Sequence, residues 1–249
     1  MNSGLRYRGE NFHLALAIIL ALILSYALFE ISTWLLIALI IIQLVYILLI
    51  QKQIQGNSLR INQYQFSDIH DIIIVLSKKM HIEPPDSYIS FDPHINAFVM
   101  GFKKPFTLVL TSALVESMDK DEVTYIIGHE LGHIRMHHAA FKSLVTPLDR
   151  GIPLLSFLFN AWLRRSEYTS DRIGFLSSLK RDKCISSLVK LAVGKELSKD
   201  IDIDDLVDQI NVSYDEQMEK FGELLLDHPY ITNRIFHLVQ FHHVTKDKI

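Results

Sequence analysis

The chain has 249 residues, of which 28 are acidic and 25 are basic, so its formal net charge at neutral pH is −3. This balance gives no indication of a nucleic-acid partner. The single cysteine, Cys184, excludes a disulfide within one chain and is compatible with a reducing compartment.

Two apolar runs open the chain. They cover residues 12–29 and 34–50 and are 18 and 17 residues long, which is at the short end for membrane-spanning helices. Only residues 30–33 lie between them, so we expect a transmembrane helical hairpin over residues 1–50. A cleaved signal peptide is the alternative. The second apolar run and the lack of an Ala-x-Ala-like site argue against it.

Basic residues flank the hairpin on both sides, with Arg6 and Arg8 before it and Lys52 and Arg60 after it. Positive charge concentrates on the cytoplasmic side of membrane proteins, so both flanks are predicted to lie there. We therefore expect a multi-pass protein of the cell (inner or plasma) membrane whose remaining chain faces the cytoplasm.

The rest of the chain is expected to contain a linker over 51–65 and one domain over 66–249, long enough for a substantial core. Residues 66–82 have the apolar spacing of an amphipathic helix. Residues 87–111 contain three short apolar or alternating runs separated by proline and glycine, which predicts a small antiparallel sheet.

The most informative stretch is residues 129–133, which read His-Glu-Leu-Gly-His. On a helix, His129 and His133 are four residues apart, so their side chains share one face. Two imidazoles placed this way can hold one Zn²⁺ at distances of about 2.0–2.1 Å. Glu130 would lie beside the metal, where it can take a proton from the attacking water. A chance match is the alternative. With 12 histidines in 249 residues, the probability of an accidental match somewhere in the chain is on the order of a few per cent.

The residues around this motif predict a helix. Asp119 can cap its N-terminus and form a capping box with Glu122. Apolar residues follow at three- and four-residue spacing. Gly128 and Gly132 each cost a helix about 1 kcal/mol relative to alanine, which indicates that another segment packs closely against them.

A catalytic zinc site needs a third protein ligand and an open position. In one class of zinc peptidase, the motif continues as His-x-x-Gly-x-x-His and the last histidine is the third ligand. That class is excluded, because Met136 and Ala139 stand three and six residues after His133. A carboxylate on a second helix remains. Glu167 can bind the metal, and Asp171, four residues later, can accept a hydrogen bond from a ligand imidazole. Arginines flank this pair, so an exposed helix with salt bridges is the alternative.

Two further segments have less specific patterns. Residues 151–163 are apolar but only 13 residues long, so they form either a core helix or a segment that dips into the membrane. Residues 198–220 are acidic and are expected to form a solvated loop and helix. A calcium-binding loop is the more specific alternative, but the glycine and the ligand spacing that such a loop requires are missing.

In combination, these features resemble the M48 family of membrane zinc metallopeptidases, which includes the HtpX-like and CAAX-prenyl-type endopeptidases. The resemblance covers about residues 60–240 and rests on four runs: 95–101 (Asn-Ala-Phe), 111–134 (His-Glu-Leu-Gly-His), 167–174 (Glu-x-x-x-Asp-Arg-x-Gly) and 228–235 (His-Pro with Arg-Ile). Ser170 stands where the family usually has alanine. The further transmembrane helices that HtpX-like proteins commonly have between the two ligand helices are missing or much reduced here.

The resemblance implies an α+β fold: a gluzincin-type zinc metallopeptidase domain, mostly helical with a small antiparallel sheet. It also implies that His228 donates a hydrogen bond to the developing oxyanion. Arg234 would support the site by pairing with Asp171 or Glu167. His228 precedes a proline, so stabilising a turn is the alternative role for it.

The segment Asn96, Ala97 and Phe98 is the candidate edge strand of the sheet. In a peptidase, such a strand can bind an extended peptide as an additional strand. An ordinary hairpin strand without this function is the alternative.

The expected function is that of a membrane-anchored zinc endopeptidase with one Zn²⁺ per chain, in which Glu130 accepts a proton from the water that attacks the peptide. Proteins or peptides are the expected substrates and the lipid bilayer a partner, in membrane-protein quality control or regulated proteolysis. A catalytically silent adaptor with a structural zinc is one alternative, but it would not need Glu130. A narrow processing protease of the prenyl-protein type is another, and the presence of only two clear spans counts against it.

Overall fold

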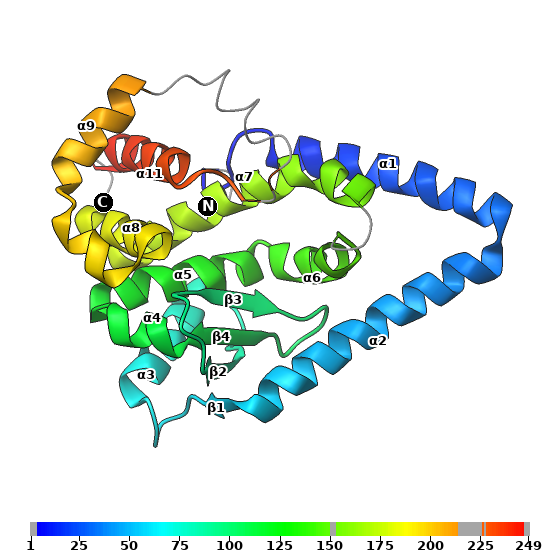
Figure 1. Cartoon of the computed structure of the whole chain (residues 1–249), viewed down its shortest axis with the longest axis horizontal. Coiled ribbons are helices and arrows are strands. Elements are labelled where there is room, and N and C mark those ends of the chain that lie inside the picture. The colour runs from blue at the N-terminus through cyan, green and yellow to red at the C-terminus, as the bar shows by residue number, and fades with distance from the viewer. Residues whose placement is uncertain (1–3, 150–152, 214–225, 227, 247–249) are drawn as a thin grey trace.

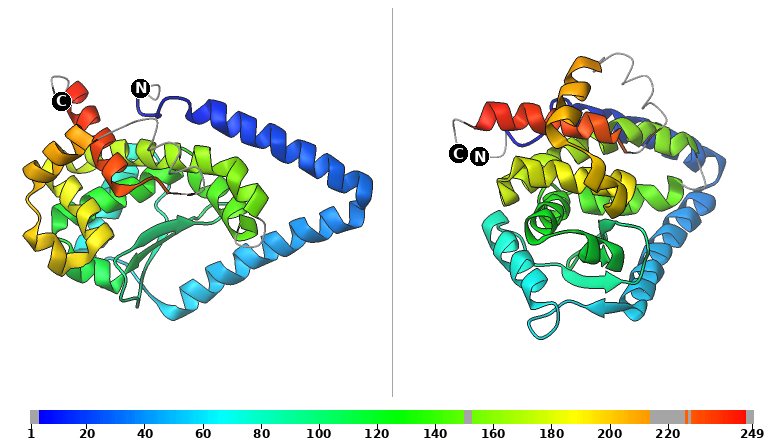
Figure 2. Two further views of the ribbon diagram at one scale, coloured as in Figure 1. Left: turned by 45° about the horizontal axis from the view of Figure 1, so that its top comes forward. Right: turned by 60° about the vertical axis from the view of Figure 1, so that its left-hand side comes forward.

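The computed structural model describes residues 4–149, 153–213, 226 and 228–246. Two long N-terminal helices project from a body in which helices stack in layers above a four-stranded sheet (Figures 1 and 2). The elements are α1 (Glu10–Ile31), α2 (Thr33–Asn57), β1 (Ser58–Arg60), α3 (Ser67–Met80), β2 (Asp86–Ser90), β3 (Ala97–Met100), β4 (Thr107–Thr111), α4 (Ser112–Ser117), α5 (Lys120–Arg135), α6 (His138–Asp149), α7 (Pro153–Ser178), α8 (Arg181–Leu197), α9 (Ile203–Ser213) and α11 (Ile231–Thr245).

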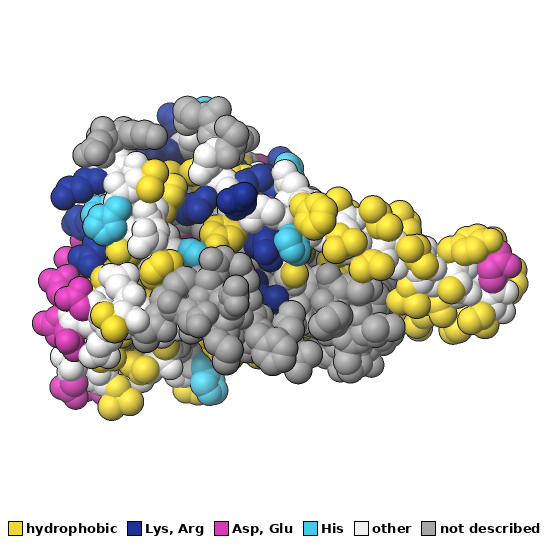
Figure 3. Space-filling model, turned by 90° about the horizontal axis from the view of Figure 1, so that it is seen from above, with side chains coloured by type: hydrophobic (Ala, Val, Ile, Leu, Met, Phe, Trp, Pro, Cys, Tyr) yellow, Lys and Arg dark blue, Asp and Glu magenta, His cyan; other side chains and the backbone are white. Residues whose placement is uncertain are grey.

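Helices α1 and α2 are apolar, and few of their residues are buried. Only 6% and 12% of their most apolar 18-residue windows are buried, whereas a core helix of a soluble protein is mostly buried. Apolar side chains cover the projecting part, and basic side chains gather near the place where it joins the body (Figure 3). With 22 and 25 residues, both helices have the length and composition of membrane spans. Ser32 alone separates them, so the expected turn over 30–33 is shorter than predicted.

Helix α1 packs against the first half of α7. Phe159, Trp162 and Leu163 of α7 are buried and form a cluster with Ala17 of α1. These α7 residues belong to the apolar stretch expected over 151–163, of which residues 151 and 152 lie outside the described part of the chain. From Pro153 onward the stretch is the start of the helix that carries Glu167.

Helix α2 is held to the body by glutamine side chains. Gln43 is buried and donates a hydrogen bond to the carbonyl oxygen of Leu144 in α6 at 3.0 Å. Six residues before the C-terminal end of α2, Gln51 donates to the hydroxyl of Thr107 in β4 at 2.9 Å. Gln43 interrupts the apolar run because its polar group bonds to the body rather than facing lipid.

Residues 51–65, expected as a linker, are largely part of regular structure. Helix α2 continues to Asn57, and β1 then pairs antiparallel with β2. Ile61 is buried in the main core. The sequence of β1 is too short and too polar to show a strand pattern. The division into a hairpin and one domain over 66–249 stays a prediction.

The sheet has the strand order β1-β2-β4-β3, with β3 on one edge. Strands β1 and β2 are antiparallel, as are β3 and β4, but β2 and β4 are parallel. The prediction of an antiparallel sheet is therefore wrong for the central pair. The chain reverses direction after β2 and again after β3, so β4 runs in the same direction as β2. Because β4 pairs with β2 and places β3 outside, the sheet becomes mixed.

Helices α5 and α7 form the centre of the body and approach each other closely. A Cβ atom on Gly128 would lie 2.5 Å from the Cβ of Ser177, and one on Gly174 would lie 2.8 Å from the carbonyl oxygen of Tyr125. Real Cβ atoms essentially never approach other atoms this closely, so these positions need glycine. The predicted close packing against Gly128 is confirmed, and this approach brings the residues of the two helices within reach of one another.

The remaining helix predictions agree with the structure in part. The capping box of Asp119 and Glu122 is present at the start of α5, and α3 covers most of 66–82. The acidic segment expected over 198–220 contains α9, whereas residues 214–220 lie outside the described part of the chain.

Candidate metal centre and active site

Three predicted ligand side chains from α5 and α7 meet in the interior. His129 and His133 lie one turn apart on α5 and are 5% and 2% exposed, and Glu167 of α7 is 3% exposed. The two Nε2 atoms are 3.2 Å apart. Glu167 places one carboxylate oxygen 3.2 Å from Nε2 of His129 and the other 3.3 Å from Nε2 of His133.

These spacings fit a small tetrahedral cation. Ligand atoms about 2.0–2.1 Å from a tetrahedral zinc ion are separated from one another by roughly 3.3–3.4 Å. The three groups offer two imidazole nitrogens and a carboxylate, a ligand set that zinc accepts. The cluster therefore has the composition and the dimensions of a metal site.

The hydrogen bonds of the two rings direct their free nitrogens into this cluster. Nδ1 of His129 is 2.9 Å from a carboxylate oxygen of Asp171, and Nδ1 of His133 is 3.2 Å from Nδ1 of His138. A neutral imidazole whose Nδ1 carries the proton presents an unprotonated Nε2. Two such lone pairs facing the carboxylate of Glu167 in a buried space require a positive charge between them.

Without a metal, a proton can supply that charge. Burial disfavours the charged form of His129, but the hydrogen bonds that its ring donates to Asp171 and Glu167 outweigh this effect and raise its pKa to about 9. Burial also opposes ionisation of Glu167, yet the positive charge of Lys142 and the neighbouring histidines hold the pKa of Glu167 well below its ordinary value. A metal ion that binds here would replace the proton on His129.

Asp171 orients His129 and is itself held by a buried arginine. Arg234 of α11 donates from Nε and Nη2 to the two oxygens of Asp171, at 2.9 and 2.6 Å. The hydroxyl of Tyr125 donates to the same carboxylate at 2.8 Å. These partners outweigh burial and keep the pKa of Asp171 below its ordinary value. Arg234 was expected to pair with Asp171 or Glu167. It donates hydrogen bonds to Asp171 and lies 3.9 Å from Glu167.

Glu130 lies next to the cluster without belonging to it. Its side chain is 7% exposed and lines the same cavity as the three candidate ligands. Burial raises the pKa of Glu130 to about 7, against the lowering effect of the nearby His129 charge. A carboxylate with a pKa near neutrality is suited to exchange protons with a reacting group.

The cavity beside the cluster has a volume of about 700 Å³. The predicted residues Asn96, Ala97 and Phe98 line it, and β3 is an edge strand of the sheet. His228 lies at this cavity too, with a side chain that is 59% exposed and an Nδ1 atom 3.8 Å from Glu167. The structure thus places all the residues predicted for the site either at this cavity or in direct contact with a residue that lines it.

Part of the cavity wall comes from an N-terminal apolar helix. Tyr46, Ile47, Ile50 and Ile54 of α2 line the same space as the candidate ligands. The surface that would contact a substrate is therefore formed jointly by the body and by a helix with the properties of a membrane span.

Sequence reasoning missed three polar contacts of the site. Tyr125, one turn before His129 on α5, could have been found from the four-residue spacing. Lys142 of α6 donates to Glu167 at 2.6 Å, and Glu10 of α1 bonds to His138 at 3.0 Å. These two come from distant parts of the chain and carry no local signal.

Comparison with known proteins supports this picture. A family model described as peptidase family M48 matches residues 63–152 and 148–241. The plastoglobule-localized metallopeptidase 48 of Arabidopsis thaliana is 30% identical over 175 residues, which are 65% of this chain and 50% of that protein. A protease HtpX homolog of Helicobacter pylori (strain Shi470) is 43% identical over 72 residues, 28% of this chain and 23% of that one. The chain spans half or less of the length of these relatives.

A solved structure shares the fold. The crystal structure of S. mikatae Ste24p matches with a TM-score of 0.56 and 17% identity, over 92% of this chain and 64% of that chain. Fold and site together define a body built around a His-His-Glu candidate metal centre, attached to two apolar helices. The chain belongs to peptidase family M48, because the family model covers more than half of its length.

Proposed function

We propose that this protein is a membrane-anchored, zinc-dependent endopeptidase. The observation that carries the proposal is the convergence of His129, His133 and Glu167 at 3.2–3.3 Å from one another, at the wall of a substrate-sized cavity. Glu130 beside this cluster supplies the proton acceptor that a purely structural zinc site would not need.

The proposed reaction divides the work among the residues of the cavity. A zinc ion bound by the three ligands would act as a Lewis acid and make water a nucleophile near neutral pH. Glu130 accepts the proton of the attacking water and passes it to the leaving nitrogen. His228, at the cavity mouth, donates a hydrogen bond to the oxygen of the attacked carbonyl. Asp171, clamped by Arg234, holds the ring of His129 in the orientation that ligation needs.

We propose that the substrate is an extended peptide with apolar side chains, presented close to the membrane surface. The edge strand β3 offers unpaired backbone groups to which a peptide can add as a further strand. In the same cavity, the isoleucines of α2 offer an apolar wall. We further propose that α1 and α2 span the bilayer with the body and the cavity on the cytoplasmic side, because basic residues flank the two helices.

Incubation of the detergent-solubilised protein with unfolded casein tests this function. We expect cleavage that stops when a zinc chelator is added and returns when zinc is restored, because the three ligands hold an exchangeable ion. Bound zinc without cleavage of casein or of any prenylated peptide would favour the silent adaptor. Cleavage confined to a prenylated peptide would favour the narrow processing protease.

The α2 wall provides a separate prediction about the cavity. Ile50→Trp adds volume on the cavity side of α2, so we expect casein cleavage to fall about tenfold or more through misplaced substrate. Zinc binding should be unchanged, because the residue is not a ligand. The matched control is Leu49→Trp on the outer side of the same helix, where the side chain is 62% exposed. Equal activity of the two variants would contradict a role of α2 in substrate binding.

A further inference from the structure

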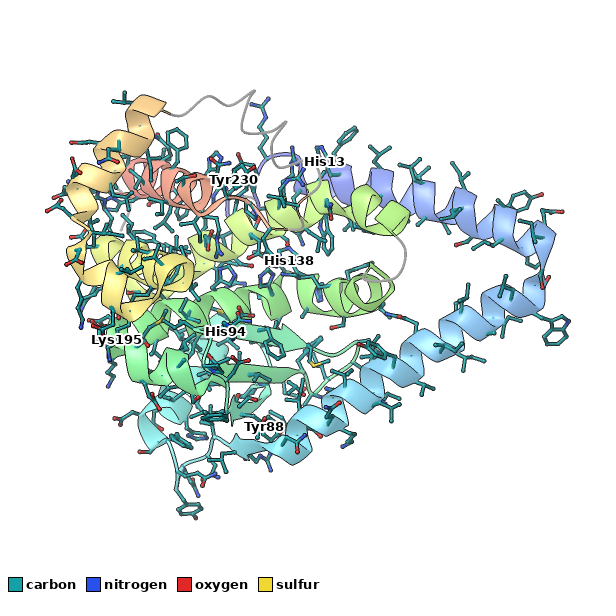
Figure 4. All side chains as sticks on the ribbon, viewed as in Figure 1. His13, Tyr88, His94, His138, Lys195 and Tyr230 are labelled. Atoms are coloured by element: carbon teal, nitrogen blue, oxygen red, sulfur yellow. The ribbon has the colours of Figure 1, made fainter. Side chains whose placement is uncertain are left out.

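A buried row of three side chains leads from His133 to the first residue of α1. The Nδ1 atom of His138 lies 3.2 Å from Nδ1 of His133, and its Nε2 atom lies 3.0 Å from a carboxylate oxygen of Glu10. None of the three residues is more than 2% exposed. His138 lies between α7 and the junction of α5 and α6 (Figure 4), with its ring edge-to-face against Trp162.

The backbone on both sides is shaped to bring these groups together. His137 has a φ of 65°, a left-handed conformation that ends α5 and turns His138 back toward the previous helix. Gly9 has a φ of 80° immediately before α1, which suits glycine because it has no Cβ. Glu10 follows as the first residue of the apolar helix and points into the body.

The Glu10 carboxylate is held by several donors. Arg6 donates to one of its oxygens and Thr169 of α7 to the other. Arg6 also donates to the carbonyl oxygen of Met136 at the end of α5, at 3.2 Å. These contacts explain why a charged group can be buried here. Arg6 and Thr169 can satisfy the carboxylate without His138. His138 instead forms a link between Glu10, through its Nε2 atom, and His133, through its Nδ1 atom.

The hydrogen bonds allow one assignment of protons in which His133 can ligate. His133 must carry its proton on Nδ1 to leave Nε2 free for the metal, so Nδ1 of His138 must accept a hydrogen bond from it. His138 then carries its own proton on Nε2 and donates a hydrogen bond to the carboxylate of Glu10. A carboxylate can only accept, so Glu10 selects this arrangement for both rings.

We propose that Glu10 and His138 are positioning residues for the metal, through which the start of the first membrane helix sets the orientation and tautomer of His133. This inference rests on the proposed function, because it takes His133 as a ligand. Partners of this kind on ligand imidazoles typically change metal affinity about 10- to 100-fold when they are removed. The hairpin would then contribute directly to the metal site and would not serve only as an anchor.

Zinc affinity of the full chain in detergent, measured by competition with a chromophoric chelator, tests the inference independently of activity. His138→Phe keeps the ring packing against Trp162 but removes the acceptor, so we expect zinc to bind about 10- to 100-fold more weakly. Glu10→Ala should weaken binding in the same direction. In the double variant Glu10→Ala with His138→Phe, affinity should be no lower than in His138→Phe, because Glu10 acts through His138.

A matched control and a milder variant complete the test. Tyr7→Phe removes a hydrogen bond to His237 that holds the same N-terminal segment, and it should leave zinc affinity unchanged. Glu10→Gln retains an acceptor without the charge and should give a smaller loss, which keeps the test open if Glu10→Ala does not fold. Wild-type affinity in His138→Phe, or an equal loss from Glu10→Ala with and without His138, would overturn the inference. Absence of zinc binding by the unaltered protein would instead overturn the proposed function.

Discussion

Glu130→Gln is expected to reduce casein cleavage by a factor on the order of 10²–10⁴ while the protein still binds one zinc ion. Glutamine has the shape of glutamate but cannot accept a proton at neutral pH, and Glu130 belongs to the cavity wall rather than to the ligand cluster. The rate of casein cleavage and the zinc content of the purified variant measure the two parts of this expectation.

A control on the same helix separates this effect from a general loss of charge. Asp121→Asn removes a carboxylate from the first turn of α5, where the side chain is 38% exposed and pairs with Lys180. Both activity and zinc content should stay close to those of the unaltered protein. Full activity of Glu130→Gln would exclude it as the proton acceptor and with it the proposed reaction.

Arg234→Met is expected to destabilise the body by about 3–5 kcal/mol, because it leaves the carboxylate of Asp171 buried without its charged partner. Both side chains are largely buried, and the guanidinium donates to both oxygens of Asp171. For a chain of this size, such a loss corresponds to a decrease in Tm of about 6–20 °C. Thermal unfolding in detergent measures it.

Two further variants make this prediction specific. Arg181→Met breaks pairs with the exposed carboxylates of Asp182 and Asp204 and should cost less than about 1 kcal/mol. In the double variant Asp171→Leu with Arg234→Met, both charges are removed, so part of the lost stability should return. Zinc affinity should not return with it, because His129 still lacks its acceptor. An unchanged Tm in Arg234→Met would contradict a stabilising role for the buried pair.

The parts of the site that depend on local spacing could be predicted. A separation of four residues places His129 beside His133, and Glu167 near Asp171, wherever a helix forms. The capping box of Asp119 and Glu122 and the two glycines of α5 indicated where that helix begins and where it packs. These features involve neighbours in the chain, so the sequence contains all the information they need.

The sheet shows where such reasoning ends. The runs that became β2, β3 and β4 were recognised, because alternation and turn residues are local signals. Their pairing was not, since the insertion of β4 between β2 and β3 depends on contacts between segments far apart in the chain. The strand β1 was missed for a related reason, because three residues form a strand only when β2 is already beside them.

By itself, the sequence determined the ligand types, their helices, the family and the two apolar N-terminal helices. Only the tertiary structure decided that Arg234 donates its hydrogen bonds to Asp171 rather than to Glu167, that α2 lines the cavity and that Glu10 reaches His138. The physical reason is that spacing along a helix dictates which side chains share a face. Which distant carboxylate, arginine or apolar wall meets that face depends on how the helices pack, and here the close approach at Gly128 and Gly174 sets that packing.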